Sequence, residues 1–94
     1  MNEKIELITS NHIDFLNFLR TKFPLFHLSN VFFRDIHYGV RFYLENKGKK
    51  ANYQEAEHIA KAVAEYLEQQ KILRKLDHQT WVVNYPNFKV KKAS

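Results

Sequence analysis

The spacing of apolar residues changes near Gln70, and this change restricts the fold more than any other feature of the sequence. Up to Gln70 the apolar positions recur at intervals of three and four residues, which is the period of one helix face. These positions are Ala56, Ile59, Ala60, Val63 and Leu67. After Gln70 the apolar positions alternate, as in strands, and a polar segment at residues 77–79 divides the alternating stretch in two. Residues 52–85 therefore predict an amphipathic helix that leads directly into a tight hairpin.

A first helix is expected from Ser10 or Asn11 to Phe23. Both starting residues suit a helix cap, because their side chains accept a hydrogen bond from a free backbone amide. Pro24 ends the helix, since a proline disfavours helical geometry at the preceding residue and has no amide hydrogen to donate. The next residues, Leu25 to Leu28, are too few for a helix, so we expect an extended segment that pairs with the later hairpin.

A second helix is expected from residue 29 or 30 to about residue 46. Gly39 lies in its interior, where glycine costs about 1 kcal/mol relative to alanine, so we expect another helix to approach closely there. Asn52 then caps the third helix, with Glu55 at the capping-box position.

One small domain is expected for a chain of 94 residues with 45% hydrophobic content. We place this domain at residues 10–86, after a lead-in of residues 1–9 that hints at a short extended segment, and before a basic tail of residues 87–94. The absence of cysteine excludes a disulfide framework and a thiolate zinc site. No apolar run approaches the roughly 18 residues of a membrane span, so we expect a soluble, cytoplasmic protein with no membrane partner.

The order of the expected elements resembles that of the winged-helix family, a helix-turn-helix fold with a small wing. That order is helix, strand, helix, helix, strand, strand, and the most specific local similarity is in AVAEYLEQQKILRKLDHQTWVV, residues 62–83. The resemblance implies a mainly α fold with a small β-hairpin, an α+β domain built on three helices. Family members often have glycine where this chain has Lys71, a position that tends toward left-handed geometry. Either Lys71 accepts a modest strain there or the helix ends differently.

The same resemblance implies binding of double-stranded DNA and a regulatory role, because the third helix of the family is often placed in the major groove. A net charge of +5 agrees with a polyanionic partner, since clustered cations gain affinity by releasing counterions from phosphates. The candidate nucleic-acid contacts are Lys49, Lys50, Gln54, His58, Lys61, Arg74, Lys75, Lys89, Lys91 and Lys92. An amide such as that of Gln54 suits an adenine edge, and lysines suit guanine or phosphate. Four glutamates against one lysine give the third helix a net charge of −3, which opposes this interpretation.

A protein-interaction or dimerisation module is the alternative, since winged-helix domains also dock without contacting DNA. Eight Phe, five Tyr and one Trp are many for a core of this size, so some of them are available for a homodimer surface. The candidates lie beside the main apolar stripes: Phe15, Phe18, Val31, Tyr38 and Phe42. The competing interpretation is that the helices and the hairpin wrap these residues into one core.

The sequence offers little support for an enzyme. Ser10 and Ser29 stand at expected helix starts, the chain has two glycines and no glycine-rich phosphate loop, and no carboxylate pair is placed in an evident pocket. The five histidines include no i, i+4 pair, which favours surface or capping roles over metal ligation. Trp81 is expected to fill the core rather than to stack on a base. We therefore expect no catalytic residues, no metal, no cofactor and no small-molecule substrate.

Overall fold

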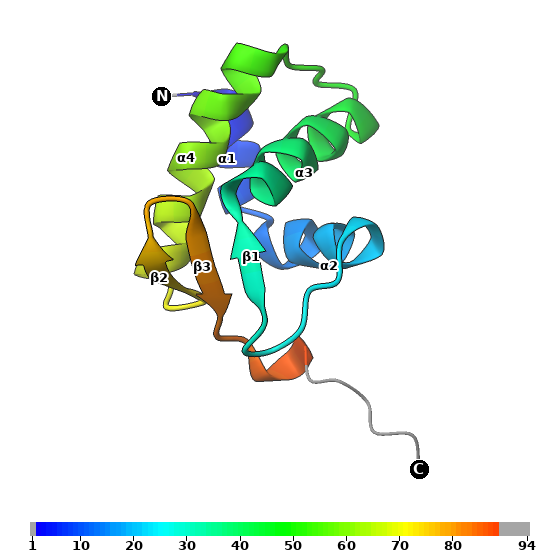
Figure 1. Ribbon diagram of the computed structural model, residues 1–94. Coiled ribbons are helices and arrows are strands. Elements are labelled where there is room, and N and C mark those ends of the chain that lie inside the picture. The colour runs from blue at the N-terminus through cyan, green and yellow to red at the C-terminus, as the bar shows by residue number, and fades with distance from the viewer. Residues whose placement is uncertain (1, 89–94) are drawn as a thin grey trace.

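The computed structural model describes residues 2–88 of the chain. Lys89, Lys91 and Lys92, the candidate contacts in the basic tail, lie outside the described residues. The described part is mainly helical with one small antiparallel sheet, an α+β structure (Figure 1), and none of its helices is long and apolar enough to cross a membrane. Its elements are α1 (Glu3–Thr9), α2 (His12–Lys22), β1 (Asn30–Phe32), α3 (Phe33–Asn46), α4 (Tyr53–Gln69), β2 (Leu73–Asp77), β3 (Thr80–Val83) and the short 3-10 helix η1 (Pro86–Phe88).

The three strands form one antiparallel sheet in the order β1-β3-β2 (Figure 1). In the hairpin, Lys75 of β2 lies opposite Trp81 of β3, and Val31 of β1 lies opposite the same tryptophan on the other side. Trp81 and Val83 are buried, so the inner face of β3 joins the core. The expected hairpin is confirmed. A short strand that lies between two helices in the sequence pairs with this hairpin, as expected.

The position of that short strand differs from the prediction. We expected residues 25–28 to be extended, whereas the strand is Asn30–Phe32, and α3 starts at Phe33 rather than at residue 29 or 30. Leu28 has a left-handed φ of 71°, and its amide donates to the carbonyl of Val83 at 2.7 Å. The chain therefore turns before it joins the sheet, and pairing with β3 fixes where the strand begins.

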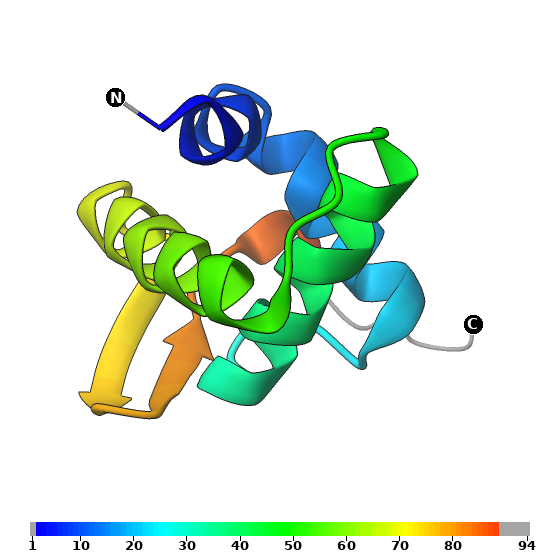
Figure 2. The same ribbon diagram turned by 90° about the horizontal axis from the view of Figure 1, so that it is seen from above.

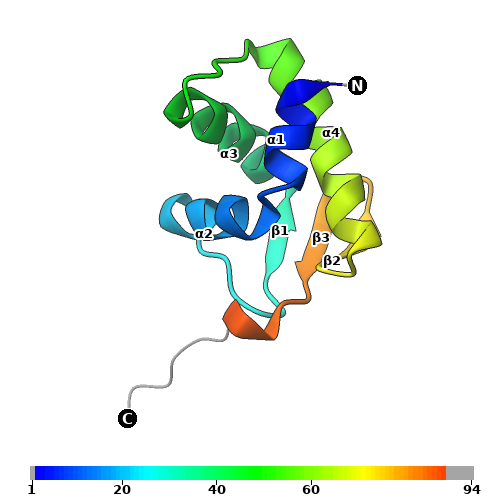
Figure 3. The same ribbon diagram turned by 180° about the vertical axis from the view of Figure 1, so that it is seen from behind.

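The N-terminal segment is helical, whereas its sequence hinted at an extended lead-in. Asn2 caps α1, because its side-chain oxygen accepts the backbone N–H groups of Lys4 at 2.8 Å and Ile5 at 3.3 Å. The helix packs against α4, as Figures 2 and 3 show, and Ile8 is completely buried. Phe88 in η1 is also buried, so the packed unit extends beyond residues 10–86 at both ends.

The core lies between the helices and the inner face of the sheet, and it contains two residues that we considered for a homodimer surface. Phe15 is 0% exposed and Val31 is 2% exposed, so neither can contact a partner at the surface. Phe18 is partly buried against the core, whereas Tyr38 and Phe42 are exposed. The competing interpretation, in which the elements wrap these residues into the core, is therefore correct for Phe15 and Val31.

Two local predictions, at Gly39 and Asn52, are confirmed, and the alternative left open at Lys71 is decided. A Cβ atom at Gly39 would overlap the Cδ2 atom of Leu19, so α2 and α3 approach closely at this glycine. Asn52 caps α4, since its Oδ1 atom accepts the backbone N–H of Glu55 at 2.8 Å. Lys71, just after α4, has a left-handed φ of 63° and allows the chain to reverse into β2.

Candidate nucleic-acid interface

A hollow of about 580 Å³ runs along one side of α4, between the N-terminal half of α3 and the hairpin, and we call it the α4 hollow. Residues of α4 reach it at spacings of three and four because such residues share one side of a helix. They are Tyr53, Glu57, Lys61, Ala64 and Glu65. The other walls are made by Phe33, Arg34, His37 and Tyr38 of α3 and by Lys75, His78, Gln79 and Trp81 of the hairpin.

Three cations from three different elements line the α4 hollow. Arg34 comes from α3, Lys61 from α4 and Lys75 from β2, and all three side chains are exposed. The carboxylates of Glu57 and Glu65 line the same hollow. With the histidines neutral, three cations and two carboxylates give the hollow a net charge of +1.

The other two glutamates of α4 are engaged in contacts within the chain. Glu55 accepts hydrogen bonds from the Nζ atom of Lys4 at 3.0 and 3.1 Å. Glu68 accepts a hydrogen bond from the indole Nε1–H of Trp81 at 3.0 Å. Lys4 offsets the charge of Glu55, whereas the neutral indole leaves the charge of Glu68 in place. Only Glu57 and Glu65 line the α4 hollow, so the hollow is less acidic than the sequence of α4 indicates.

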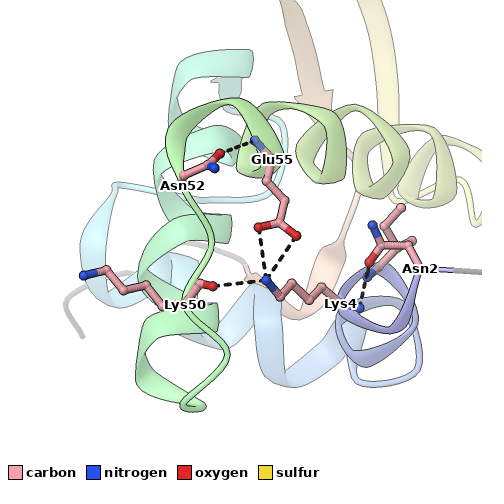
Figure 4. Close-up of polar contacts among 6 residues, drawn as sticks. Asn2, Lys4, Lys50, Asn52 and Glu55 are labelled. Atoms are coloured by element: carbon pink, nitrogen blue, oxygen red, sulfur yellow. Dashed lines mark hydrogen bonds and ion pairs between the residues drawn. The ribbon is translucent and has the colours of Figure 1, made fainter.

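The loop before α4 is tied to α1 by the same Lys4 side chain. Figure 4 shows its ammonium group between the carboxylate of Glu55 and the backbone carbonyl of Lys50, which it reaches at 3.1 Å. The expected capping box is only half formed, since Asn52 accepts the N–H of Glu55 while the Glu55 carboxylate turns to Lys4 (Figure 4). Lys49 and Lys50 are consequently held near the N-terminus of α4 with exposed side chains.

The hairpin turn is stabilised by Asp77, whose Oδ1 atom accepts the backbone N–H of Gln79 at 2.8 Å. This hydrogen bond is the main reason why the pKa of Asp77 lies below its ordinary value. The turn carries His78 and Gln79, which both line the α4 hollow.

The predicted contacts do not all lie together. Lys61 and Lys75 line the α4 hollow, and Gln54 and His58 are exposed on α4 beside it. Arg74 precedes Lys75 on β2, and adjacent side chains of a strand point to opposite faces, so Arg74 lies on the other face of the sheet.

Arg34 is a site residue that the sequence analysis missed, and Tyr38 was assigned to a dimer surface instead. Both line the α4 hollow from α3. Their spacing of four residues, followed by Arg41 three residues later, was the available signal, since residues at these intervals share one helix face.

Within residues 2–88, no group of three or more His, Asp or Glu side chains is placed to hold a metal ion. Comparisons of the chain with protein-family models, with curated proteins and with solved structures find no match. The case for a function therefore rests on the geometry of the chain itself.

Proposed function

We propose that this protein is a winged-helix domain that binds double-stranded DNA through the α4 hollow. The element order from α2 to β3 supports the winged-helix assignment, since it is the order that the sequence resemblance implies. In this proposal α4 faces the major groove, which is wide enough to admit a helix. The start of α3 and the hairpin then flank α4 and contact phosphates on either side.

One observation carries the proposal: Arg34, Lys61 and Lys75 come from three separate elements and line one hollow. Each of the three elements contributes one cation. Cations spread over three elements can reach phosphates on both edges of a duplex groove. Gln54 and His58 are exposed on α4 and are available to base edges, while Lys49 and Lys50 extend the basic surface at the start of the helix.

The test is the salt dependence of binding to a mixed-sequence DNA duplex, measured by fluorescence anisotropy. Lys61→Ala and Lys75→Ala should each weaken binding to all sequences and reduce the slope of log affinity against log salt by about 1. Lys22→Ala is the matched control, because it removes one positive charge from α2, where Lys22 lies over the rings of Phe18 and Phe42 and outside the hollow.

The control variant should keep the slope of the unchanged protein. Absence of salt-sensitive binding by the unchanged protein contradicts the proposal, and so does an equal effect of all three substitutions. Light scattering in the same buffers reports the oligomeric state, so that a change of assembly is not mistaken for a lost contact.

A further inference from the structure

His37 is the one buried histidine among the described residues, and it contacts two exposed tyrosines. Its Nε2 atom lies 3.0 Å from the carbonyl oxygen of Tyr53 and donates its hydrogen there, because a carbonyl can only accept. The His37 ring lies edge-on to Tyr53, with 4.4 Å between centroids, and stacks on Tyr38 at 5.9 Å with 25° between the planes. His37 therefore links α3 to the first turn of α4 and holds the Tyr53 ring in an edge-on contact.

Both tyrosines are exposed, and Tyr53 is also restrained by its contact with His37. Tyr53 is 54% exposed and Tyr38 is 37% exposed, and both line the α4 hollow. Arg41 lies 6.0 Å from the centroid of the Tyr53 ring, within the range of a cation–π contact. Rings that are already held in place lose little conformational entropy on binding, so they provide contact area at low entropic cost.

Trp81 is not available for the same role. It is 4% exposed, and its indole N–H donates to Glu68. The ring of Phe33 lies 6.4 Å from it, centroid to centroid, and is itself partly buried. These two residues form a wall of the hollow, as expected for a tryptophan that fills the core, and leave Tyr38 and Tyr53 as the exposed aromatic surface.

The neighbours of the tyrosines in the hollow indicate what kind of ligand would use them. Arg34 and Lys61 line the same hollow and supply positive charge beside the rings. A nucleotide combines a planar base, which stacks on aromatic rings, with a phosphate, which binds cations. Inside a duplex the neighbouring base pairs cover both faces of a base, so an aromatic side chain can stack there only on a base that has left the stack. A single-stranded base offers its face directly.

We propose that Tyr53, held by His37, and the neighbouring Tyr38 form a stacking platform for an unpaired base, with Arg34 and Lys61 on its phosphates. The inference rests on the proposed function and narrows its ligand to nucleic acid in which a duplex adjoins a single-stranded segment. Such a ligand places paired bases along α4 and the first unpaired base against the tyrosines.

The experiment compares binding of one mixed-sequence DNA as a blunt duplex, as a duplex with a single-stranded overhang and as a single strand. The unchanged protein should prefer the overhang duplex to the blunt duplex. Tyr53→Leu and Tyr38→Leu should each weaken overhang binding by about 5- to 150-fold, the range for loss of one stacked base, and should weaken blunt-duplex binding less than overhang binding. Tyr53→Phe and Tyr38→Phe keep a ring and should retain the preference.

Phe42→Leu is the matched control, because Phe42 is 47% exposed on α3 and borders a separate depression with Phe18 and Lys22. It should change no affinity. Equal binding of blunt and overhang duplexes by the unchanged protein overturns the stacking proposal without any variant, and it leaves the proposed function standing if the salt slope responds to Lys61→Ala. Absence of binding to every probe overturns both proposals.

Discussion

At the scale of single residues, Asp14 and Tyr43 form a polar link between α2 and α3. The Tyr43 hydroxyl donates to the Oδ2 atom of Asp14 at 2.8 Å, and the Nζ atom of Lys47 lies 3.4 Å from the same oxygen. The hydrogen bond from Tyr43, followed by the charge of Lys47, outweighs desolvation and lowers the pKa of Asp14. Burial and the nearby carboxylate raise the pKa of Tyr43 to about 12.

These two shifts predict a stability that falls at both ends of the pH range. A carboxylate with a lowered pKa stabilises the folded state above its unfolded pKa of about 4, and this contribution is lost as the pH falls further. A tyrosine with a raised pKa stabilises the folded state below about pH 10, and this contribution is lost as the pH rises toward its folded pKa. Asp14→Asn should therefore flatten the acid decline, and Tyr43→Phe should flatten both declines.

Urea unfolding midpoints measured across this pH range test the prediction. Glu45→Gln is the control, since it removes an exposed carboxylate of α3 outside the Asp14 contact and should keep both declines. An Asp14→Asn protein with the same acid decline as the unchanged protein would mean that other carboxylates cause it.

The Asp14–Tyr43 contact illustrates which residue-level features could be predicted. The sequence placed Asp14 near the start of a helix, but its partner is 29 positions away and only the packing of α2 against α3 brings them together. The left-handed geometry at Lys71 was one of two alternatives that the family resemblance left open, and the backbone after the end of α4 adopts it.

At the scale of elements, the contact of α2 with α3 depends on Gly39. Gly39→Ala should gain about 1 kcal/mol in helix propensity, but the added methyl group overlaps Leu19 and should cost more than this gain. The net result should be a loss of roughly 1–2 kcal/mol in the free energy of unfolding, measured by urea titration.

The same substitution made in a Leu19→Ala protein separates the two effects. Leu19→Ala removes the atoms that Gly39 faces, so Gly39→Ala should then be neutral or stabilising through its helix propensity. An equal loss in the free energy of unfolding in both backgrounds would show that the overlap with Leu19 is not what makes a side chain at position 39 unfavourable.

The order of the elements was predictable from the hydrophobic period, whereas the exact residues of the short elements were not. The helix from Tyr53 and the hairpin after it were found because each period persists over several residues. The strand β1 has three residues, and its place is set by hydrogen bonds to β3 rather than by its own pattern. The seven residues of α1 are likewise too few for a period to be distinguished from an extended segment.

At the scale of the whole molecule, the candidate site could be predicted only in part, because it is assembled from separate elements. The cations Lys61 of α4 and Lys75 of the hairpin were found from the sequence, but the contribution of Arg34 depends on how α3 lies against α4. The neutralisation of Glu55 depends on α1, whose Lys4 is 51 positions away. A charge count from the sequence assigns all four carboxylates of α4 to one exposed surface, whereas in the fold they lie in different surroundings.

If the protein binds DNA as proposed, Lys4 should influence that binding without lining the α4 hollow. The Lys4 and Glu55 side chains are 24% and 38% exposed, so Lys4→Met should cost no more than about 1 kcal/mol in the free energy of unfolding. It leaves the Glu55 carboxylate unpaired near Lys50 and the start of α4, where it repels phosphates. Duplex affinity should fall by up to roughly fivefold, since a unit charge at about 4 Å contributes about 1 kcal/mol in water.

The double variant Lys4→Met with Glu55→Gln decides how Lys4 acts. If Lys4 acts by neutralising Glu55, removing both charges should restore the duplex affinity and the salt slope of the unchanged protein, because the net charge at this end of α4 is then the same. The Lys4 ammonium group also donates to the carbonyl of Lys50, and this contact is lost in both variants. An affinity that stays low in the double variant would therefore assign the effect to the position of the loop and its lysines, and would exclude charge neutralisation as the role of Lys4.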